Sequence, residues 1–521
     1  MGSKKVQVWL PLLLSAMMVA GMMIGYRLKF LSPAKKSSLD EVLNLVKEKY
    51  VDALPGDSIN QAAITDLLSR LDPHSVYIAP PDMKEADEEL AGSFAGIGIE
   101  FQLLNDTVNV VSVMTGGPSE KAGVAVGDKM IKANDSVVLA GVHITPENIR
   151  KQLRGQLGST VSITFLHDGK QKNISITRGS IAVPSIDAAY IIAPQTGYVR
   201  INKFGEHTYP EFMVNLEKLQ KQGMQKLLLD LRGNGGGFLN EAIDIADEFL
   251  DGDKLIVYTE GNHSPRKNYN AKRDGLFEKG KLAVLVDETS ASASEILAGA
   301  LQDWDRATII GRRTFGKGLV QEQFQLSNGG EVRLTIARYF TPVGRNIQKP
   351  YDKGKEKYEE ELWNRYHTGE VVSGDTSKSR GPSFKTPAGH VVYGGGGITP
   401  DVFVPYDTTK MAQGVSKLFY RNTLSSFVYT YFLQHRNFFQ SMRSVNDLEK
   451  QFIPGEKEWQ ELCVYAMKDS VVLGSVTGKQ KEDILKTVRA LMARQLWRME
   501  GYFEVMNAGD PVIQKCLELV K

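Results

Sequence analysis

A continuous apolar run occupies residues 6–24 and follows Lys4 and Lys5. Nothing in this run is charged, and about twenty apolar residues are enough to span a bilayer. Its length and the lack of a small-residue cleavage site favour a retained anchor over the alternative, a cleaved signal peptide. Either segment exports the rest of the chain. Residues 1–36 therefore predict a single-pass inner-membrane protein whose remaining residues lie on the periplasmic side.

Apolar residues at helical spacing predict a helical region at residues 37–90. Val42 and Val46 repeat with this spacing, and a second helix is expected to end before Pro73. His74 follows this proline without a partner motif, so we expect it to have a structural role rather than a catalytic one.

Residues 409–521 also show helical spacing, for example at Ile484 and Val488. Aromatic side chains gather between residues 418 and 432, a pattern more typical of a core than of a ligand site. Together with residues 37–71, this C-terminal region is a candidate for a homodimer interface.

The central part of the chain changes from β-rich to alternating α/β patterns. Residues 91–180 hold several β-rich runs separated by glycine turns. Within residues 181–408, apolar runs at 197–201 and 226–230 flank a helical pattern at 209–221. Strand and helix alternation of this kind is typical of a layered α/β fold.

A glycine-rich turn follows the second of these apolar runs. Residues 232–237 read RGNGGG, and a helical pattern comes next. Glycine-rich turns that lead into helices present free backbone N–H groups to an anion. The anion is either a phosphate or a developing oxyanion, and we favour the oxyanion because Ser292 lies next along the chain. The simpler alternative is a tight turn without a ligand.

Residues 287–321 are the stretch most indicative of chemistry. The strand-like run LAVLVDE leads into the small residues TSASAS and then into the helical run EILAGALQDW. Small neighbours at a strand-to-helix turn leave room for a substrate backbone beside Ser292. Small residues before a helix are also common N-caps, so this pattern alone does not establish a nucleophile.

Residues 311–318 read GRRTFGKG, which is close to a phosphate-binding loop. That loop requires Ser or Thr where Gly318 stands, and a helix should follow it. The chain instead continues in two β-rich runs around residues 327–330, which is a hairpin pattern. Nucleotide binding is therefore disfavoured, and Lys317 between two glycines becomes a candidate for other chemistry.

Together these residues resemble the active-site region of the carboxy-terminal processing peptidases, also called tail-specific proteases. The family uses a Ser-Lys dyad. Its motif S-A-S-A-S-E places the nucleophile at Ser292, and its G-K-G turn places the general base at Lys317. Gln321 matches a glutamine that helps to hold the lysine. The resemblance covers most of residues 37–408.

The resemblance implies a multidomain α/β protein. A crotonase-like α/β protease core spans residues 181–408, with an inserted β-rich PDZ domain at residues 91–180 and helical N- and C-terminal regions. It also implies an oxyanion hole that joins the N–H of Ala293 to one N–H of the glycine-rich turn, which contains Gly235, Gly236 and Gly237.

The PDZ resemblance places a carboxylate-binding loop at Gly96, Ile97, Gly98 and Ile99. Glycine-freed N–H groups suit a terminal carboxylate, and an exposed strand edge can take up an extended peptide. The expected partners are therefore the C-terminal tails of unfolded or precursor proteins. The expected reaction is endoproteolysis through an acyl-enzyme, without a cofactor or a metal.

Residues 351–390 interrupt this pattern with a polar, charged segment that is poor in aliphatic residues. Shorter members of the family nearly fuse the two flanking segments. We therefore expect an insertion that forms an exposed, partly helical flap.

Composition changes this picture little. The 521 residues have a net charge of +2, which points away from nucleic acid as a partner. The two cysteines, Cys463 and Cys516, have no metal-ligand neighbours and form no disulfide framework. A single bridge between them is the alternative in an oxidising compartment.

Two other functions stay open at this point. One is a membrane-tethered PDZ adaptor with an inactive protease domain, against which the intact Ser292, Lys317 and Gln321 argue. The other is a crotonase-fold acyl-CoA enzyme, which the apolar N-terminal run and the PDZ-like segment disfavour. None of the eight histidines lies in a motif with a serine, so a Ser-His triad is also disfavoured.

Overall fold

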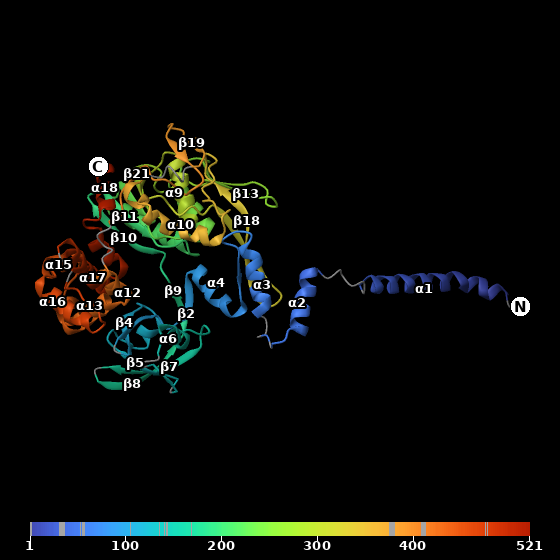
Figure 1. The fold of residues 1–521 in the computed structure, drawn as a ribbon, viewed down its shortest axis with the longest axis horizontal. Helices are drawn as coiled ribbons and strands as arrows, with labels where there is room; N and C mark the ends of the chain where they lie inside the picture. Colours follow the sequence, from blue (N-terminus) through green and yellow to red (C-terminus); the bar gives the residue numbers. More distant parts are fainter. Residues whose placement is uncertain are drawn as a thin grey trace. The chain divides into compact units, whose positions relative to one another are not determined.

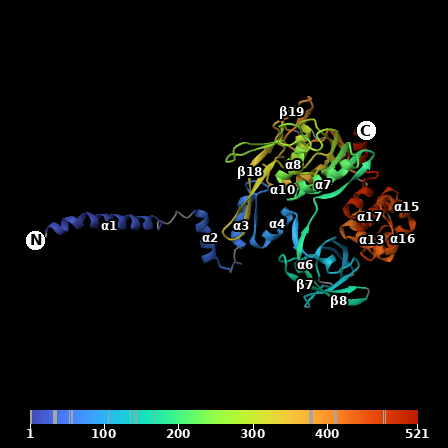
Figure 2. The ribbon, with the colours of Figure 1, turned by 180° about the vertical axis from the view of Figure 1, so that it is seen from behind.

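The fold is that of a computed structural model, shown from two opposite sides in Figures 1 and 2. Contacts divide the chain into two compact units, and the boundary lies between Leu71 and Asp72. The structure describes residues 3–30, 37–52, 54, 58–104, 106–134, 136–139, 141, 144–167, 169–374, 381–407, 413–474, 476 and 478–521.

The first unit contains, in its described residues, α1 (Ser3–Phe30), α2 (Ser38–Lys49) and α3 (Ser58–Ser69). α2 begins after the N-cap Ser37, whose hydroxyl accepts a hydrogen bond from Asp40 N while the Asp40 carboxylate accepts one from Ser37 N. The helical region predicted at residues 37–90 is therefore confirmed by α2, α3 and, in the second unit, α4 (Met83–Ala91), but it is wrong at Val76–Ile78, which form the strand β1.

The anchor predicted at residues 6–24 falls within α1, and the side chains of residues 6–8 lie outside the described part of the chain. No helix among the described residues combines the length and the apolar character needed to cross a membrane. Membrane attachment therefore stays a prediction from the sequence.

The α/β core of the second unit is built on a six-stranded sheet in the order β10-β11-β12-β15-β16-β21. β10 and β11 are antiparallel, and the other neighbours are parallel. Loops that follow parallel strands meet at one edge of the sheet. The strands are β10 (Ile186–Ala193), β11 (Thr196–Ile201), β12 (Lys226–Asp230), β15 (Lys281–Val286), β16 (Thr308–Gly311) and β21 (Val402–Phe403).

Successive side chains of these strands face two different layers. Leu227 and Leu229 pack in one core cluster with residues of α7 (Thr208–Lys221), α8 (Leu239–Asp247) and α9 (Ala293–Asp303). Leu228 and Leu285 belong to a second cluster with residues of α18 (Pro511–Leu519). Both faces are covered, which explains why these strands read as continuous apolar runs.

A second sheet carries the hairpin predicted around residues 327–330. Its order is β1-β18-β13-β14, with β17 also paired to β18. β1 pairs with β18 in the register Val76↔Arg333, so the segment at residues 72–78 lies beside the hairpin. The strands are β1 (Val76–Ile78), β13 (Leu255–Glu260), β14 (Lys267–Asn270), β17 (Leu319–Gln325) and β18 (Glu331–Phe340).

The PDZ-like domain has a separate sheet in the order β3-β4-β5-β7-β8, with β6 paired to β5. Its core joins Val108 and Phe165 to Ile149 of α6 (Pro146–Leu153). β2 (Ser93–Gly96) pairs with β9 (Gly179–Ala182) where the chain enters and leaves the domain. The remaining elements are η1 (Pro80–Asp82), α4 (Met83–Ala91), β3 (Ile99–Leu104), β4 (Thr107–Val113), α5 (Pro118–Lys121), β5 (Lys129–Ala133), β6 (Val137–Val138), β7 (Thr160–His167) and β8 (Lys170–Thr177).

The helices from α12 to α17 have a core of their own, and we call them the C-terminal helical module. The predicted aromatic cluster is part of that core, since Phe427, Tyr431 and Phe432 are buried in it. Cys463 and Cys516 are free, so the alternative of a bridge is not realised. The helices are α12 (Gln413–Tyr420), α13 (Thr423–Gln434), α14 (Arg436–Gln440), α15 (Val445–Gln451), α16 (Glu456–Met467) and α17 (Lys479–Asn507).

The segment at residues 351–390 is partly helical, as predicted, but the expectation that it is exposed is wrong for the buried side chains of its two helices. α10 (Lys355–His367) buries Tyr358 and Arg365, and α11 (Glu370–Ser373) buries Val371. Charged residues can be buried when they are paired and hydrogen-bonded, which the polar composition did not reveal. The segment continues in β19 (Ser383–Lys385) and leads to β20 (Val391–Tyr393), while residues 375–380 lie outside the described part.

Candidate active site

Ser292 lies at the turn between β15 and α9, where it is the N-cap of the helix. Its φ of 55° and ψ of −113° lie in a region that non-glycine residues rarely adopt and that costs about 1–3 kcal/mol. Its backbone N–H donates to Glu295 Oε2 at 2.8 Å. The strained turn holds a half-buried hydroxyl at the start of a fully buried helix.

Lys317 lies on the loop between β16 and β17. Its Nζ donates a hydrogen bond to Gln321 Oε1 at 3.0 Å. Burial lowers the pKa of Lys317 below its ordinary value, although the carboxylates of Glu295 and Asp72 act in the opposite direction. A lower pKa increases the share of neutral amine, which is the form that accepts a proton. Within the described residues, no hydrogen bond joins Lys317 Nζ to the Ser292 hydroxyl.

Glu295 connects the two turns. This fully buried carboxylate accepts hydrogen bonds from Ser292 N, from the Thr314 hydroxyl, from Gly316 N at 2.7 Å and from Lys317 N at 2.9 Å. Burial raises the pKa of Glu295, and its four donors oppose that effect. Glu295 was not among the predicted site residues, although Ser292 and Glu295 form the S-x-x-E pattern of a capping box.

Tyr339 of β18 connects the same turns from another direction. Its hydroxyl lies 3.2 Å from the carbonyl oxygen of Ser292 and also contacts that of Lys317. The side chain is buried, and burial raises the pKa of its hydroxyl well above the usual value. The hydroxyl therefore stays protonated and can donate to these oxygens.

Gln321 is itself held by the segment before the PDZ-like domain. Its Nε2 donates to the carbonyl oxygen of His74. The His74 ring lies 2.8 Å from the Tyr358 hydroxyl, and burial together with the nearby Lys317 charge lowers the pKa of His74 to about 4. His74 is therefore neutral near pH 7 and supports the base through its backbone, in line with the predicted structural role.

The glycine-rich turn lies directly against Ser292. A Cβ atom added to Gly236 would stand 2.7 Å from Ser292 Cβ and 3.0 Å from Ala293 N, so only glycine fits there. The N–H of Gly236 already donates to Asn234 Oδ1 at 2.9 Å. No acceptor is recorded, in the part of the chain that the structure describes, for the N–H groups of Gly235, Gly237 or Ala293.

Asn234, which was not among the predicted site residues, joins this turn to the nucleophile. Its carbonyl oxygen accepts hydrogen bonds from Ala291 N at 3.0 Å and from the Ser294 hydroxyl at 2.9 Å. Its side chain is fully buried and donates to Ile201 O at 3.0 Å. The glycine turn and the serine turn are therefore fixed to each other on both sides of Ser292.

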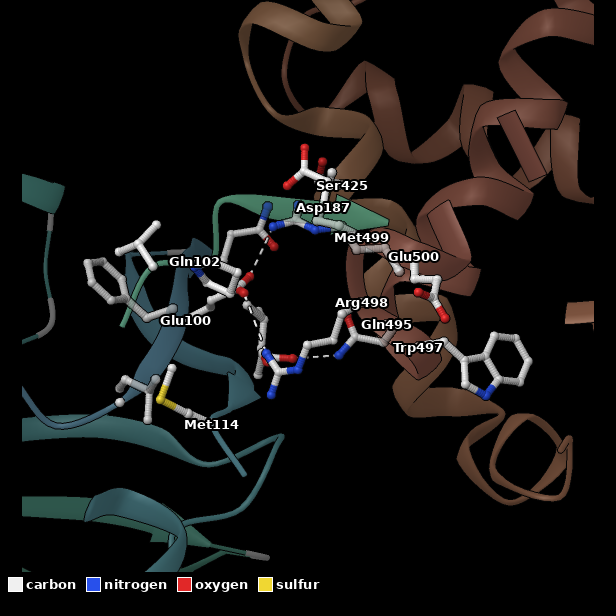
Figure 3. A pocket seen from close by; sticks show the side chains of 18 of the residues that line it. Glu100, Gln102, Met114, Asp187, Ser425, Gln495, Trp497, Arg498, Met499 and Glu500 are labelled. Atoms are coloured by element: carbon white, nitrogen blue, oxygen red, sulfur yellow. Dashed lines mark hydrogen bonds and ion pairs between the residues drawn. The ribbon is translucent and has the colours of Figure 1, made fainter. Parts of the chain in front are cut away.

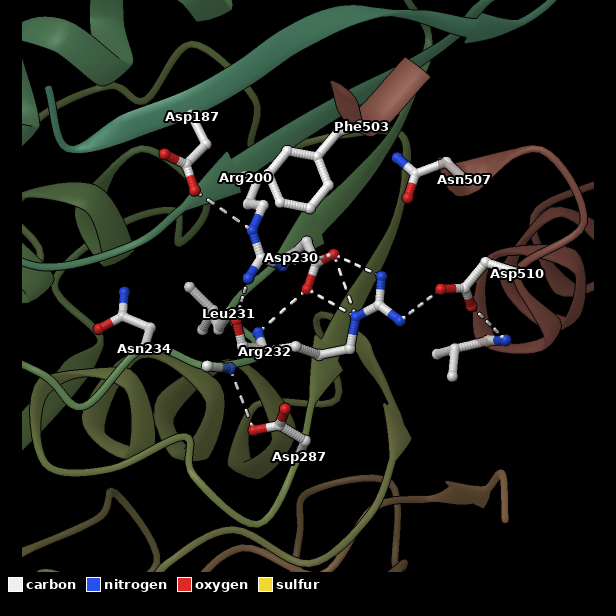
Figure 4. A network of polar contacts seen from close by, with 12 residues as sticks. Asp187, Arg200, Asp230, Leu231, Arg232, Asn234, Asp287, Phe503, Asn507 and Asp510 are labelled. Carbon is white, nitrogen blue, oxygen red and sulfur yellow. Dashed lines mark hydrogen bonds and ion pairs between the residues drawn. The ribbon is translucent and has the colours of Figure 1, made fainter. Parts of the chain in front are cut away.

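A buried ion network lies beneath the glycine turn (Figure 4). Asp230 at the end of β12 contacts Arg232 at 2.7 Å and Arg200 at 3.1 Å. Burial opposes the ionisation of Asp230, but Arg232 and Arg200 outweigh it and hold the pKa of Asp230 well below its usual range. Arg232 also contacts Asp510 at 2.9 Å, which ties the N-cap of α18 to this corner of the core.

α10 fastens the loop that precedes Lys317. The buried guanidinium of Arg365 donates to three successive carbonyl oxygens, those of Arg313 at 3.0 Å, Thr314 at 2.8 Å and Phe315 at 3.1 Å. Glu361 pairs with Arg365 at 2.9 Å, and it also pairs with Lys349 and Arg313. No local sequence pattern predicts these contacts, because the partners are about fifty positions apart.

The predicted carboxylate-binding loop joins β2 to β3. Gly96 ends β2, Ile99 begins β3, and Gly98 between them adopts a φ of +74°. The described residues offer no acceptor for the N–H groups of Ile97 and Gly98. The loop therefore has the free donors that a terminal carboxylate requires.

Three family models match parts of the chain. Residues 195–354 match peptidase family S41, residues 95–177 match a PDZ domain, and residues 415–498 match a family of unknown function. A protein of Staphylococcus aureus named "Probable CtpA-like serine protease" is 33% identical over 335 residues. That match covers 63% of this chain and 66% of the relative's length.

Two solved structures resemble the chain in part. A photosystem II D1 C-terminal processing protease is 30% identical, with a TM-score of 0.36, and the match covers 60% of this chain and 84% of that one. The PDZ domain of a carboxy-terminal protease from Vibrio cholerae, solved with a peptide, is 26% identical with a TM-score of 0.16. The latter match covers 17% of this chain and 97% of that domain.

Proposed function

This chain belongs to the carboxy-terminal processing peptidases of family S41, and we propose that it is a serine endopeptidase that recognises the C-terminal tails of its protein substrates. The observation that supports this proposal best is that Glu295 is hydrogen-bonded to both catalytic turns. This buried carboxylate accepts hydrogen bonds from the backbone N–H groups of Ser292 and Lys317. It therefore connects the strained turn of the serine to the turn of a lysine whose pKa is lowered.

In the proposed reaction, the Ser292 hydroxyl attacks the scissile carbonyl carbon and Lys317 accepts its proton. Lys317 can continue to donate to Gln321 Oε1 while its lone pair faces the serine. The C–N bond of the substrate then breaks, the leaving amine takes the proton from Lys317, and an acyl-enzyme remains. Water, deprotonated by Lys317, hydrolyses the ester and restores Ser292.

The oxyanion is assigned to backbone donors. Ala293 N lies at the N-terminus of α9, where the first N–H groups have no partner within the helix. The second donor comes from Gly235 or Gly237, because the N–H of Gly236 donates to Asn234. Gly236 supplies close approach instead, as its missing Cβ leaves room beside Ser292. Donors of this kind typically contribute about 10²–10³-fold to kcat.

Tail recognition is assigned to the loop at Gly96, Ile97, Gly98 and Ile99. The free N–H groups of Ile97 and Gly98 support this assignment, and β3 is the terminal strand of its sheet and can take up a peptide as an added strand. Peptides with an apolar last residue and a free carboxylate should therefore bind better than the same peptides with an amidated end.

The test of the whole proposal is hydrolysis of an unfolded protein by the chain and by Ser292→Ala and Lys317→Ala variants. Each substitution should reduce turnover by roughly 10³-fold or more, because the two residues act as a unit. Folding is checked by circular dichroism. Wild-type turnover in Lys317→Ala would contradict the dyad, and tail binding without any hydrolysis by the intact chain would support the adaptor alternative.

Export, attachment to the inner membrane through residues 6–24 and self-association through the helical regions are further parts of this proposal. Their support is the apolar run of the sequence and the helical character of both regions. Cell fractionation with protease accessibility, followed by sedimentation of the purified chain, tests each part. A cytosolic location would contradict the first, and a monomer at working concentrations the last.

A further inference from the structure

The C-terminal helical module packs directly on the PDZ-like domain, beside the strand proposed to receive a tail. Tyr429 of α13 donates to Val110 O at 3.0 Å, and Gln495 and Arg498 of α17 donate to Val111 O and Val113 O. Val111 is the extra residue of a β-bulge opposite β3, so its carbonyl is available for such a bond. These contacts give the module a fixed register on β4.

A cavity of about 870 Å³ lies between the two parts, within the usual range of about 300–1,000 Å³ for ligand sites. Residues 98–102, from the carboxylate-binding loop into β3, line it on one side. Arg494, Trp497 and Arg498 of α17 line it on the other side, and Figure 3 labels Trp497 and Arg498 among the residues of the lining. A peptide added to β3 from the carboxylate-binding loop onward would therefore meet α17.

The two arginines in this wall share one carboxylate from β3. Arg494 contacts Glu100 at 3.0 Å, and Arg498 lies 3.8 Å from the same side chain. The other acidic residues of the lining have partners elsewhere. Asp187 pairs with Arg200 at 3.4 Å, and Glu500 lies 3.8 Å from Lys218 Nζ and accepts a hydrogen bond from Ala189 N at 3.1 Å. The wall facing β3 therefore has one positive charge more than its local acid neutralises.

The backbone of Arg498 is also strained. Its φ of 58° and ψ of −149° interrupt α17, a conformation that costs about 1–3 kcal/mol for a non-glycine residue. The break directs the guanidinium to Ser112 and to the carbonyl of Val113. Arg498 is thereby fixed to β4, while Glu100 is the partner recorded for the guanidinium of Arg494 within the described residues.

We infer that Arg494, supported by Arg498, selects substrate tails with an acidic penultimate residue. The inference rests on the proposed tail binding to β3. In an antiparallel pair, side chains directly opposite each other share a face. A terminal residue bound at the loop lies opposite Ile99, whose side chain packs against the PDZ core. The penultimate residue then lies opposite Glu100 and faces α17, where a carboxylate can pair with Arg494.

The experiment uses the full chain with Ser292→Ala, which prevents cleavage, and labelled peptides that end in an apolar residue. The peptides differ only in having Glu, Gln or Lys at the penultimate position. The Glu peptide should bind about threefold to fivefold more tightly than the Gln peptide, as expected for a partly exposed ion pair. Arg494→Gln should remove this difference between the two peptides. Arg443→Gln is the matched control, since Arg443 is an exposed arginine of the same module outside the cavity lining.

Reversal of the charge at Arg494 gives an independent test of the inference. With Arg494→Glu, the Lys peptide should become the preferred ligand, and circular dichroism checks that the module is folded. Equal binding of the Glu and Gln peptides, or a preference that survives in Arg494→Gln, overturns the inference. The same peptides with an amidated C-terminus test tail recognition separately from the role of Arg494. If amidation does not weaken binding, the proposed tail recognition fails. If amidation weakens binding while the Glu preference is absent, only the role of Arg494 fails.

Discussion

The two sides of the active-site corner are held in different ways. The nucleophile side has a local contact, since Ser292 N donates to Glu295 three positions later at the start of α9, in addition to the contacts from Asn234 and Tyr339. The base side depends on distant segments. Gln321 donates a hydrogen bond to the carbonyl oxygen of His74. Arg365 of α10 donates hydrogen bonds to carbonyl oxygens of the loop before Lys317.

This difference indicates which parts can adjust independently. The Ser292 turn has one of its hydrogen bonds within its own short motif, and that contact does not depend on distant packing. A base held by segments at residues 72–74 and 355–367 depends on how those segments pack, and the first of them leads directly into the PDZ-like domain. We therefore expect substitutions on the nucleophile side to cause a large loss of kcat, and substitutions on the base side to lower kcat only in part.

Glu295 belongs to both sides, so its loss should have the largest effect. Glu295→Ala leaves the buried N–H groups of Ser292, Gly316 and Lys317 without their acceptor. We expect a loss of about 3–5 kcal/mol in the free energy of unfolding, measured by urea titration. Glu295→Gln, which keeps the shape, should lower kcat by about 10²-fold with a smaller loss of stability.

The control for this pair is Glu322→Gln, because Glu322 is an exposed carboxylate on β17 near the same loop. It should change neither kcat nor the unfolding midpoint. A Glu295→Gln enzyme with wild-type kcat would show that the two turns keep their geometry without the carboxylate between them.

The candidate residues Ser292, Lys317 and Gln321 were predicted from the sequence, whereas the distant contacts that hold them were not. The motif around Ser292 is a local turn whose geometry follows from small residues and a helix start, and the α/β core follows from continuous apolar strands. The exposed flap was predicted because polar composition usually means exposure. The actual role of Arg365 depends on backbone carbonyls about fifty positions away, which a polar sequence cannot specify.

Arg365→Met should have the next largest effect, and it tests the base side alone. Removing this buried guanidinium leaves three carbonyl oxygens without donors and Glu361 with one partner fewer. We expect a loss of about 2–4 kcal/mol in unfolding free energy and a fall of about tenfold in kcat, measured with a small ester substrate.

Lys357→Met on the same helix is the matched control for Arg365. Lys357 is exposed and forms a surface ion pair with Glu360, so its loss should leave the unfolding free energy nearly unchanged. If both variants lose the same stability and activity, α10 does not position the lysine loop.

Gln321→Met should have a moderate effect, because it removes one hydrogen bond from Lys317 and one from the His74 carbonyl. We expect kcat to fall by about tenfold while KM for a small ester stays nearly constant, since the amine loses orientation rather than charge. Gln323→Met, at an exposed position on the same strand, should leave both constants unchanged. A rise in KM with unchanged kcat would place Gln321 in substrate binding instead.

The smallest effect concerns two charges near Lys317, those of Asp72 and Arg333, which both belong to the base side. The base must be neutral, so activity should rise with pH as Lys317 loses its proton. The Arg333 cation lowers the pKa of Lys317, whereas the Asp72 carboxylate raises it. Arg333→Gln should therefore raise the pKa and move the acidic limb of kcat/KM to higher pH. Asp72→Asn should lower the pKa and move that limb to lower pH.

The opposite signs separate electrostatics from damage to the fold, since damage would lower the plateau of both variants without moving their limbs in opposite directions. Asp72 accepts hydrogen bonds from His74 N and Ser75 N at 2.8 Å, and an asparagine oxygen can still accept them. Arg338→Gln is the control, because Arg338 is exposed on the same strand as Arg333 and its charge is not among those that shift Lys317. Limbs that move in the same direction in both charge variants would mean that a group other than Lys317 governs the ascent. The general base would then have to be sought elsewhere in the corner.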